Sequence, residues 1–391
     1  MTTENGNAYE ANPKARKNRF DRMEWAGAFG DLGTLIPFVV AYISLLKMDP
    51  CGMLLAFGIA KIISGFYYKT PFPIQPMKAI GAIAATQSAE TIIITPNAVY
   101  GAGVVTGVIW FLLGVTGAAK KAADLIGRPV AVGIIMGLGF GFMLEGIKMM
   151  SQEWILGGTA LVGTMVLLTN RVVPVMFLLL IVGAFAAVVH NPTLLDDLTL
   201  MRVDFRLPAY AMAGMSWQEF AIGIVFMALP QVPLTLGNAV IAVTEENNRL
   251  FPDRPVTQEK VAISTGILNL LGPMIGAVPM CHGAGGMAGH VRFGARTGGA
   301  LIILGVLIVV VALFFSSSVE TIFKILPMPV MGVILFLTGA QLALGSCDFG
   351  KSREASFVTL VTAACAVWNI GLAIVVGVVS YHFLKRGWMK L

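Results

Sequence analysis

PFPIQPMKAIGAIAA (Pro71–Ala85) and VPMCHGAGGMAGH (Val278–His290) are two stretches rich in proline, glycine and polar residues within an otherwise strongly apolar chain. Proline and glycine disfavour the interior of a helix, so each stretch predicts a break in one. Because lipid supplies no hydrogen bonds, unwound backbone at membrane depth is tolerated only inside protein or beside a water-filled cavity. One such break in each half of a membrane chain indicates a binding site for a solute.

The composition is typical of a membrane protein. Of the 391 residues, 57% are hydrophobic and 12% are charged, and the mean hydropathy is +0.81. A soluble domain would contain about 25% charged residues. We therefore predict an all-α polytopic membrane protein embedded in a lipid bilayer. The net charge of +6 reflects basic loop residues, which set the topology of membrane proteins, and no nucleic-acid partner is expected.

Hydropathy predicts about 14 transmembrane segments, since one span needs roughly 20 residues. They are residues 25–46, 51–69, 73–90, 97–119, 129–149, 152–169, 173–190, 217–244, 258–276, 279–292, 297–315, 320–345, 355–369 and 371–386. With a cytoplasmic N-terminal tail (residues 1–22), most loop lysines and arginines fall on the inner side. The outer side receives Lys47, Lys148, Arg202, Arg206 and Lys324. This asymmetry predicts a multi-pass protein of the cell (inner) membrane with both termini in the cytoplasm.

A polar extracytoplasmic link, residues 191–215, divides the predicted segments into two sets of about seven. An odd number per set places the halves in opposite orientations, which is the arithmetic of a 7+7 inverted repeat. Each half begins with a span that has a polar centre, EWAGAFGDLGTLIPF in the first and MALPQVPLTLGNAV in the second. Two spans later each half has its break, so the third and tenth segments are predicted to be broken half-helices.

The prolines of the first break place the start of a helix near Pro76 or Met77. The free N–H groups of its first turn and the positive end of the helix dipole would then point into the membrane, an arrangement that binds anions. Lys78 lies in the same turn. Gln75, Met77 and Lys78 are therefore candidate substrate contacts. The alternative is a proline kink in which Lys78 extends to the membrane interface.

Pro279 begins the second break, and its glycines would let the backbone approach a ligand without an intervening side chain. His282 could donate a hydrogen bond or carry a proton. The candidate contacts here are Cys281, His282, Gly283, Ala284, Gly285 and Gly286. The alternative is that the glycines only allow helices to pack closely, as small residues do in membranes.

The polar centres of the first and eighth segments contribute further candidates. Asp31 and Thr34 lie well inside the first span, where an acidic residue is costly and usually functional. Gln231, Thr235 and Asn238 are spaced so that they share one helix face. Their amides and hydroxyl are neutral donors suited to an oxyanion. The alternative role for these side chains is hydrogen bonding between helices.

The sum of the predicted charges indicates the chemistry of the ligand. Two helix N-termini supply roughly half an elementary charge each. With Lys78 the total about matches a doubly negative solute, and a cation would be repelled. The cysteines show neither metal-ligand spacing nor a disulfide framework, so no metal and no cofactor are predicted. They are Cys51, Cys281, Cys347 and Cys365.

At these residues the chain resembles the molybdate transporter family, which is related to sulfate permeases and, more distantly, to nucleobase transporters. The matching stretches are GDLGTLIP (Gly30–Pro37), PFPIQPMKAI (Pro71–Ile80), PQVPLTLGNAV (Pro230–Val240) and CHGAGGMAGHVRFGARTGG (Cys281–Gly299). The resemblance implies a core domain, residues 23–121 and 216–316, and a gate domain, residues 128–190 and 319–391. It also implies a homodimer.

The resemblance further implies that substrate is held between the third and tenth segments. The contacts carried over from the family are Gln75, Lys78, Gln231, Thr235, Asn238 and the Gly283–Gly286 backbone. Many sulfate permeases have a C-terminal regulatory domain, which is expected to be absent because the chain ends at Leu391, soon after the last predicted span. This favours the molybdate branch of the family.

The expected function is secondary active transport of a tetrahedral oxyanion, molybdate first, by alternating access. No Walker motif is apparent, so ATP is not expected to be the direct energy source. Asp31, His282 and Glu245 motivate symport with a proton. Sulfate transport by the same architecture and a passive anion channel remain alternatives. An enzyme is not expected, because Cys281 and His282 are adjacent in sequence and would rarely face each other as nucleophile and base.

Overall fold

The computed structural model describes residues 17–85, 94–167, 175–344 and 352–389, and most of these residues are helical. In the first half the helices are α1 (Arg22–Ala28), α2 (Leu32–Leu46), α3 (Pro50–Tyr68), α4 (Lys78–Ala85), α5 (Pro96–Val115), α6 (Ala118–Ile126), α7 (Arg128–Met150), α8 (Trp154–Leu167), α9 (Val175–His190) and α10 (Thr193–Thr199). In the second half they are α11 (Trp217–Ile222), α12 (Leu229–Leu234), α13 (Val243–Leu250), α14 (Gln258–Leu271), α15 (Ala284–Arg292), α16 (Gly299–Phe314), α17 (Val319–Lys324), α18 (Met328–Leu344), α19 (Arg353–Trp368) and α20 (Ile370–Lys385).

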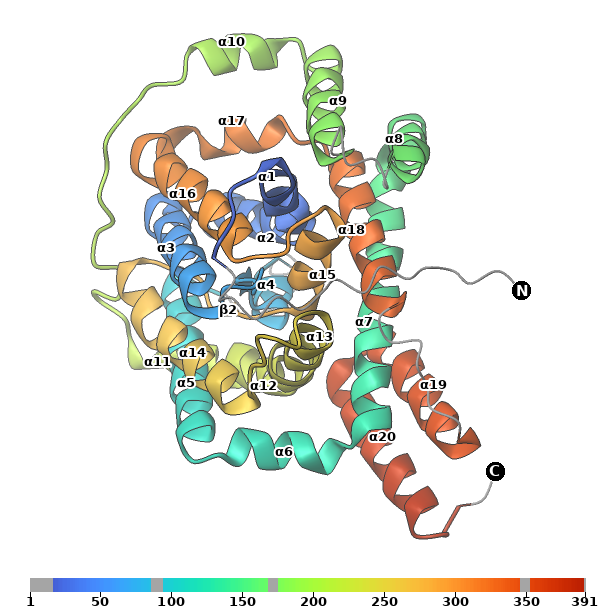
Figure 1. Ribbon diagram of the computed structural model, residues 1–391. Coiled ribbons are helices and arrows are strands. Elements are labelled where there is room, and N and C mark those ends of the chain that lie inside the picture. Colours follow the sequence, from blue (N-terminus) through green and yellow to red (C-terminus); the bar gives the residue numbers. More distant parts are fainter. Residues whose placement is uncertain (1–16, 86–93, 168–174, 345–351, 390–391) are drawn as a thin grey trace.

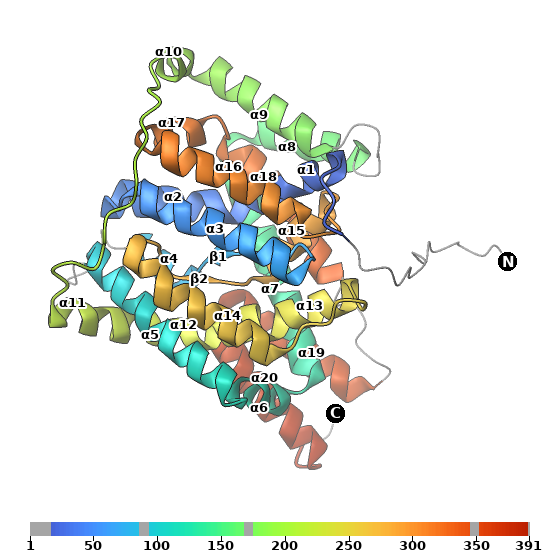
Figure 2. The same ribbon diagram turned by 60° about the vertical axis from the view of Figure 1, so that its left-hand side comes forward.

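The prediction of an all-α protein needs one correction. Two strands of two residues each, β1 (Gln75–Pro76) and β2 (Met280–Cys281), form a small antiparallel pair. They lie at the two breaks, where prolines and glycines exclude a continuous helix. Figure 2 shows this pair at the centre of the molecule, with α4 and α15 extending to opposite sides of it. The third and tenth segments are therefore short helices preceded by extended backbone, as predicted.

A helix lies in every predicted transmembrane segment. In the described ranges, five helical runs are long and apolar enough to cross a membrane, or up to seven if each bent pair is one span. Others, such as α4 and α15, are too short to cross alone, so a total of about 14 crossings stays a prediction. The end of the third segment (residues 86–90), Cys347 and most of the N-terminal tail lie outside the described residues.

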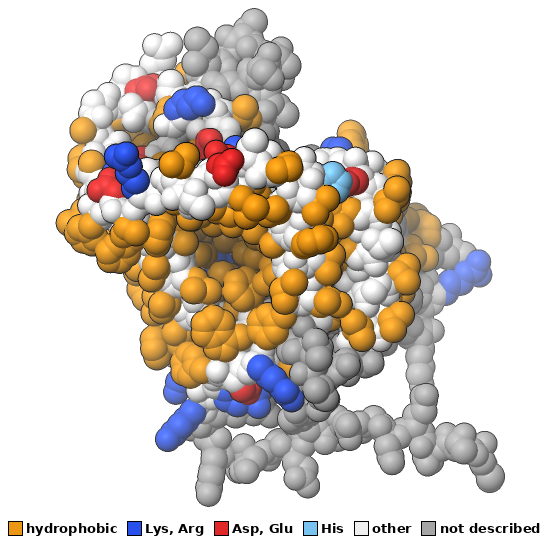
Figure 3. All heavy atoms as spheres, turned by 90° about the horizontal axis from the view of Figure 1, so that it is seen from above, with side chains coloured by type: hydrophobic (Ala, Val, Ile, Leu, Met, Phe, Trp, Pro, Cys, Tyr) orange, Lys and Arg blue, Asp and Glu red, His pale blue; other side chains and the backbone are white. Residues whose placement is uncertain are grey.

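The outer surface is apolar where a lipid bilayer would contact it. Ile155 of α8 is 83% exposed and Trp217 of α11 is 77% exposed. On the face in Figure 3, hydrophobic side chains form a broad band, with mixed charges along one edge and mostly Lys and Arg along the other. In water such a surface would be unfavourable, whereas in a bilayer it contacts hydrocarbon.

The helices form two groups that stand side by side in Figure 1. In one group α3 packs along α16 and α5 packs along α14. In the other, α7 packs along α18 and is also lined by α19 and α20. Close contact between α3 and α16 depends on glycine, because a Cβ on Gly58 would lie 2.8 Å from the carbonyl oxygen of Gly305. Small residues at such crossings are typical of membrane helices.

Two predicted spans differ from simple helices. Residues 320–345 were expected as one segment, but Pro327 separates α17 from α18, and α17 is bent by 95° away from α16. The eighth segment is continuous from α11 to α13 but contains two π-helical parts, η4 (Gly223–Ala228) and η5 (Thr235–Ala242). Pro230 and Pro233 lie between them, and proline removes the amide that a regular helix needs.

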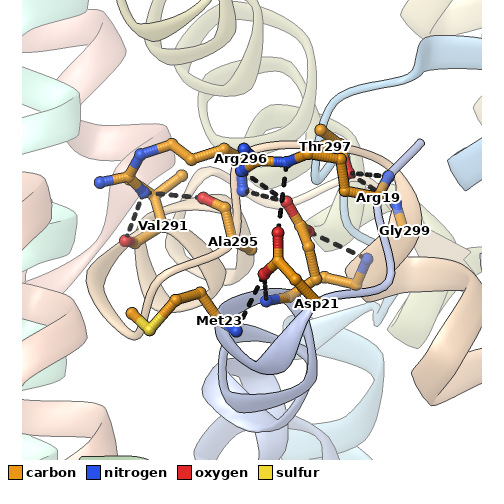
Figure 4. A network of polar contacts seen from close by, with 10 residues as sticks. Arg19, Asp21, Met23, Val291, Ala295, Arg296, Thr297 and Gly299 are labelled. Carbon is orange, nitrogen blue, oxygen red and sulfur yellow. Dashed lines mark hydrogen bonds and ion pairs between the residues drawn. The ribbon is translucent and has the colours of Figure 1, made fainter. Parts of the chain in front are cut away.

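A buried carboxylate fixes the N-terminal helix against the second half of the chain. Glu24 accepts hydrogen bonds from the backbone N–H groups of Arg296 (3.0 Å) and Ala300 (3.2 Å). Beside it, the Arg19 N–H donates to Thr297 Oγ1 at 3.1 Å. Figure 4 shows this network where α1 meets the connection between α15 and α16. The carboxylate also stabilises the start of α16, because negative charge is favourable at a helix N-terminus.

Candidate functional site

The two breaks, far apart in sequence, meet in space. Gln75 pairs with Cys281 and Pro76 pairs with Met280 across the strands. The Met77 N–H also donates to the carbonyl oxygen of Pro279 at 2.8 Å. Helix α4 begins at Lys78, one or two residues later than predicted, and α15 begins at Ala284. Both helix N-termini therefore start from one crossing point.

Gln75 is held on one side by a fully buried polar cluster. Its Nε2 donates to Asp31 Oδ1 at 2.5 Å and to Thr34 Oγ1 at 2.6 Å. The Thr34 hydroxyl in turn donates to the Asp31 carboxylate. Asp31 and Thr34, both predicted candidates, thus lie together beside Gln75, but the carboxylate is already used by protein donors.

Lys61 of α3, which is not among the predicted site residues, completes this cluster. Its Nζ lies 3.3 Å from Asp31 Oδ2 and donates to the carbonyl oxygen of Ile74 at 2.7 Å. A lysine in the middle of an apolar span was the available signal, because such a charge needs a partner. The pair neutralises Asp31 and ties the backbone of the first break to α3.

Gln231 caps α4 instead of leaving its first turn free. Its Oε1 accepts from the N–H groups of Ala79 (2.8 Å) and Ile80 (3.4 Å), and its Nε2 donates to Thr235 Oγ1 at 2.9 Å. This corrects the expectation that the first-turn amides of α4 all point to a ligand. Buried N–H groups require an acceptor, and Gln231 supplies it.

The start of α15 is crowded, which explains its glycines. A Cβ on Gly285 would lie 2.6 Å from Cζ of Phe142 in α7, and one on Gly286 would lie 2.7 Å from Cβ of Pro73. A Cβ on Gly283 would collide with the Gln75 side chain and lie 3.4 Å from Asn238 Nδ2. The amides of Gln75 and Asn238 therefore both lie beside the N-terminus of α15.

Three buried polar atoms at this crossing have no hydrogen-bond partner among the described residues. They are Gln75 Oε1, Lys78 Nζ and Asn238 Oδ1. The Lys78 ammonium lies 3.9 Å from the centre of the Phe142 ring, which is a cation–π contact. Buried polar groups are normally paired, so three unpaired ones in one place indicate a ligand site.

A cavity of about 470 Å³ reaches Lys78 between the two helix groups. It is lined by Thr34, Phe38, Lys78, Phe142, Glu145 and Lys148, among others. Its volume is within the range of about 300–1,000 Å³ typical of small-molecule sites. A second cavity of about 620 Å³ lies near the start of α7 and is lined by Arg128, Glu245 and Arg249.

His282 does not reach the Lys78 cavity. Its Nδ1 lies 2.9 Å from the carbonyl oxygen of Pro73, and its Nε2 lies 2.7 Å from Ser264 Oγ. It lines a different cavity between α3 and α14. Met280 and His282 line this cavity, and Cys281 between them does not. The expected contact of His282 with substrate is therefore not supported by its position.

Comparison with known proteins identifies the family. The sequence model of a family described as "Molybdate transporter of MFS superfamily" matches residues 23–142 and 223–342. The chain belongs to the molybdate transporter family. Its relatives include Molybdate transporter 2 of Arabidopsis thaliana, which is 32% identical over 93% of this chain and 87% of that protein. Molybdate transporter 1 of the same plant is 29% identical over 93% of this chain and 88% of that protein.

Membership of the molybdate transporter family confirms the resemblance seen in the sequence. Because its relatives are named as transporters, the prediction that the chain is not an enzyme is also confirmed. Family and apolar helices together establish a multi-pass membrane protein.

Solved structures show the same fold. The transmembrane domain of the cyanobacterial bicarbonate transporter BicA aligns with a TM-score of 0.56 at 12% identity, over 93% of this chain and 98% of that one. The murine anion transporter Slc26a9 in its inward-facing state aligns with a TM-score of 0.61 at 14% identity, over 97% of this chain and 70% of that one. At such low identity the likeness concerns the fold alone.

Proposed function

We propose that this chain is a secondary active transporter that carries a tetrahedral oxyanion, molybdate first, across the membrane. The observation that carries the proposal is the buried, unpaired ammonium of Lys78 beside the crossing strands. An uncompensated buried charge is strongly unfavourable, so a site built around it requires a negative ligand. The relatives named as molybdate transporters support the choice of substrate.

The candidate residues divide into two roles. Lys78, Asn238 and the backbone of Gly283–Gly286 would contact the oxyanion directly, since the start of α15 carries the positive end of a helix dipole. Asn238 would present its NH₂ group, because the two ends of an amide are interchangeable by rotation. The other candidates would act indirectly, by holding strand β1 and helix α4 in place. They are Asp31, Thr34, Gln75, Gln231 and Thr235.

The pairing of helices supports a 7+7 inverted repeat. The family matches two stretches of equal length, one in each half of the chain. If α3 corresponds to α14 and α5 to α16, then the α3–α16 contact is the counterpart of the α14–α5 contact. The strands β1 and β2 correspond in the same way and pair with each other. The proposed repeat would contain about 14 spans in opposed sets.

We further propose that transport uses alternating access between a core domain (residues 23–121 and 216–316) and a gate domain (residues 128–190 and 319–391). The cavity at Lys78 and the cavity near Arg128 approach opposite ends of α7. Movement of the core domain along α7 and α18 would expose the bound oxyanion first to one cavity and then to the other. A homodimer in the inner membrane, with both termini cytoplasmic, completes this proposal.

Uptake by purified protein in proteoliposomes, with detection of molybdenum, tests the function. Tungstate should compete with molybdate because it has the same shape and charge, and uracil should not compete. Uptake that uracil blocks, or that tungstate leaves unchanged, would contradict the proposal. Faster uptake of sulfate than of molybdate would identify the sulfate alternative.

Counterflow separates a carrier from an anion channel. A carrier exchanges labelled for unlabelled molybdate, so an internal load of unlabelled substrate should accelerate entry of the label. A channel gives no such acceleration. Proton symport is tested in the same vesicles with an imposed pH gradient. If the rate of uptake does not change with the gradient, transport is not coupled to protons.

A further inference from the structure

The groove between α3 and α14 is separate from the Lys78 cavity. Its volume is about 420 Å³, and its walls include Ile59 and Ile63 of α3 and Ile267 and Leu271 of α14. Ile63 and Leu271 are each 60% exposed, so the groove lies open on the outer surface of the helix group. Helices α3 and α14 lie on the side of the molecule opposite α7, α18, α19 and α20 (Figure 1).

The floor of this groove is the back of the two breaks. Ile74, Met280 and His282, which belong to or adjoin the crossing strands, line it. The polar groups here satisfy one another, since Tyr68 Oη lies 2.8 Å from Ser264 Oγ and that oxygen lies 2.7 Å from His282 Nε2. The groove therefore offers an apolar surface that contacts the same strands that carry Gln75 and Cys281.

One end of the groove is basic. Lys260, in the first turn of α14, is an exposed residue that lines the groove. Lys69, also exposed, directly follows α3 in a left-handed backbone conformation with φ of 56°. Both lysines are near the contact between Tyr68 and Ser264, which joins the two helices at this end. The groove is thus an apolar slot with the exposed Lys260 at one end, where Lys69 also begins the segment after α3.

We propose that one anionic phospholipid binds in this groove and stabilises the crossing strands. Its acyl chain would lie between α3 and α14, and its phosphate would lie near Lys260 and Lys69. Three features fit this occupant: apolar walls in the hydrophobic band, open access from the bilayer, and positive charge where a headgroup would lie. Because the acyl chain would press on Ile74 and Met280, the lipid would favour the strand position that forms the oxyanion site.

Native mass spectrometry of the purified protein tests binding directly. The wild type should retain one phosphatidylglycerol in preference to phosphatidylcholine. Ile267→Trp would fill the slot and should lose this lipid. Lys260→Gln should weaken retention about fivefold, since one basic residue near a membrane surface contributes about that factor. Val108→Trp on α5 is the matched control. Val108 and Ile267 are both 43% exposed, but Val108 does not line the groove, so this variant should retain the lipid as the wild type does.

Equal retention in Ile267→Trp and Val108→Trp would overturn the proposed site, as would the absence of any preference for the anionic lipid. The effect on transport rests on the proposed function and is measured separately, as molybdate uptake in vesicles with and without phosphatidylglycerol. Uptake by the wild type should fall without the anionic lipid, whereas uptake by Ile267→Trp should not depend on it. If uptake by Ile267→Trp depended on phosphatidylglycerol as strongly as uptake by the wild type does, lipid in the groove would not be what affects transport.

Lipid retention is measured without any substrate, so it distinguishes the two proposals. Failure of molybdate uptake in every lipid, together with selective retention of phosphatidylglycerol, would contradict the transport function and support the lipid site.

Discussion

Lys61 Nζ lies 3.3 Å from Asp31 Oδ2, and neither side chain has exposed surface. The pair joins α3 to the end of the short 3₁₀ turn before α2, and it lies directly behind Gln75. Removing one member of a buried ion pair is far more costly than removing both, because it leaves a single uncompensated charge. This asymmetry makes the pair testable.

We predict that Lys61→Met destabilises the protein by about 3–5 kcal/mol, the typical result of breaking a buried pair. The double variant Lys61→Met with Asp31→Asn should recover most of this loss, since it leaves no buried charge. Thermal unfolding in detergent, followed by fluorescence, measures both. A Lys61→Met variant as stable as the wild type would show that the ion pair does not support the fold.

Lys78→Met should abolish high-affinity molybdate uptake while the protein still inserts and elutes as a folded species. Within the part of the chain that the structure describes, the Lys78 ammonium makes no hydrogen bond, so its loss breaks none and removes only the cation–π contact with Phe142. Lys148→Met is the matched control, because Lys148 lines the same cavity but its side chain is 77% exposed. Its effect should be small. Normal uptake by Lys78→Met would exclude this lysine from the site.

Gly285→Ala should reduce uptake because its methyl group would collide with the ring of Phe142. Overpacking of this kind typically costs about 1–3 kcal/mol. Gly163→Ala in α8 is the control, since apart from the neighbouring backbone of α8 itself no described atom lies within 4 Å of the added methyl group. Combining Gly285→Ala with Phe142→Leu should restore part of the activity. If the combined variant is no better than the single one, contact between α15 and α7 is not the cause.

Two substitutions of Gln231 separate its capping of α4 from the effect of charge near the site. Gln231→Leu removes the acceptor of the Ala79 and Ile80 amides and should lower stability by about 1–3 kcal/mol. Gln231→Glu keeps an acceptor for these amides but adds a negative charge near the site, so it should raise the KM for molybdate more than Gln231→Leu does. Unfolding temperature and KM are read on the same preparations. An unchanged KM in Gln231→Glu would place the substrate elsewhere.

The positions of the two breaks could be predicted from the sequence because proline and glycine act locally on the backbone. That substrate lies between them was implied by the resemblance to the molybdate transporter family. The partner of Asp31 could not be predicted in the same way, since Lys61 approaches it only after α3 has folded back against the break. The charge of Asp31 inside a predicted span indicated that it has a partner, but the sequence did not indicate which residue that is.

The same limit applies to side-chain direction. Gln231 was predicted to share a polar helix face with Thr235 and Asn238, but whether its amide meets a ligand or the start of α4 depends on tertiary packing. His282 was predicted to contact the ligand because it lies in the second break and could donate a hydrogen bond or carry a proton, yet its ring nitrogens contact Ser264 and Pro73. Local pattern therefore located the two breaks, whereas the contacts of each side chain depend on the three-dimensional fold.

The most direct test of the site is a crystal structure with tungstate, whose anomalous scattering marks the anion without ambiguity. We predict one strong peak beside the N-terminus of α15, at a tungsten position that places a tungstate oxygen within about 4 Å of Lys78 Nζ, the usual N···O limit for an ion pair. A peak elsewhere in the molecule, or occupancy of the predicted position in a Lys78→Met variant equal to that in the wild type, would contradict it.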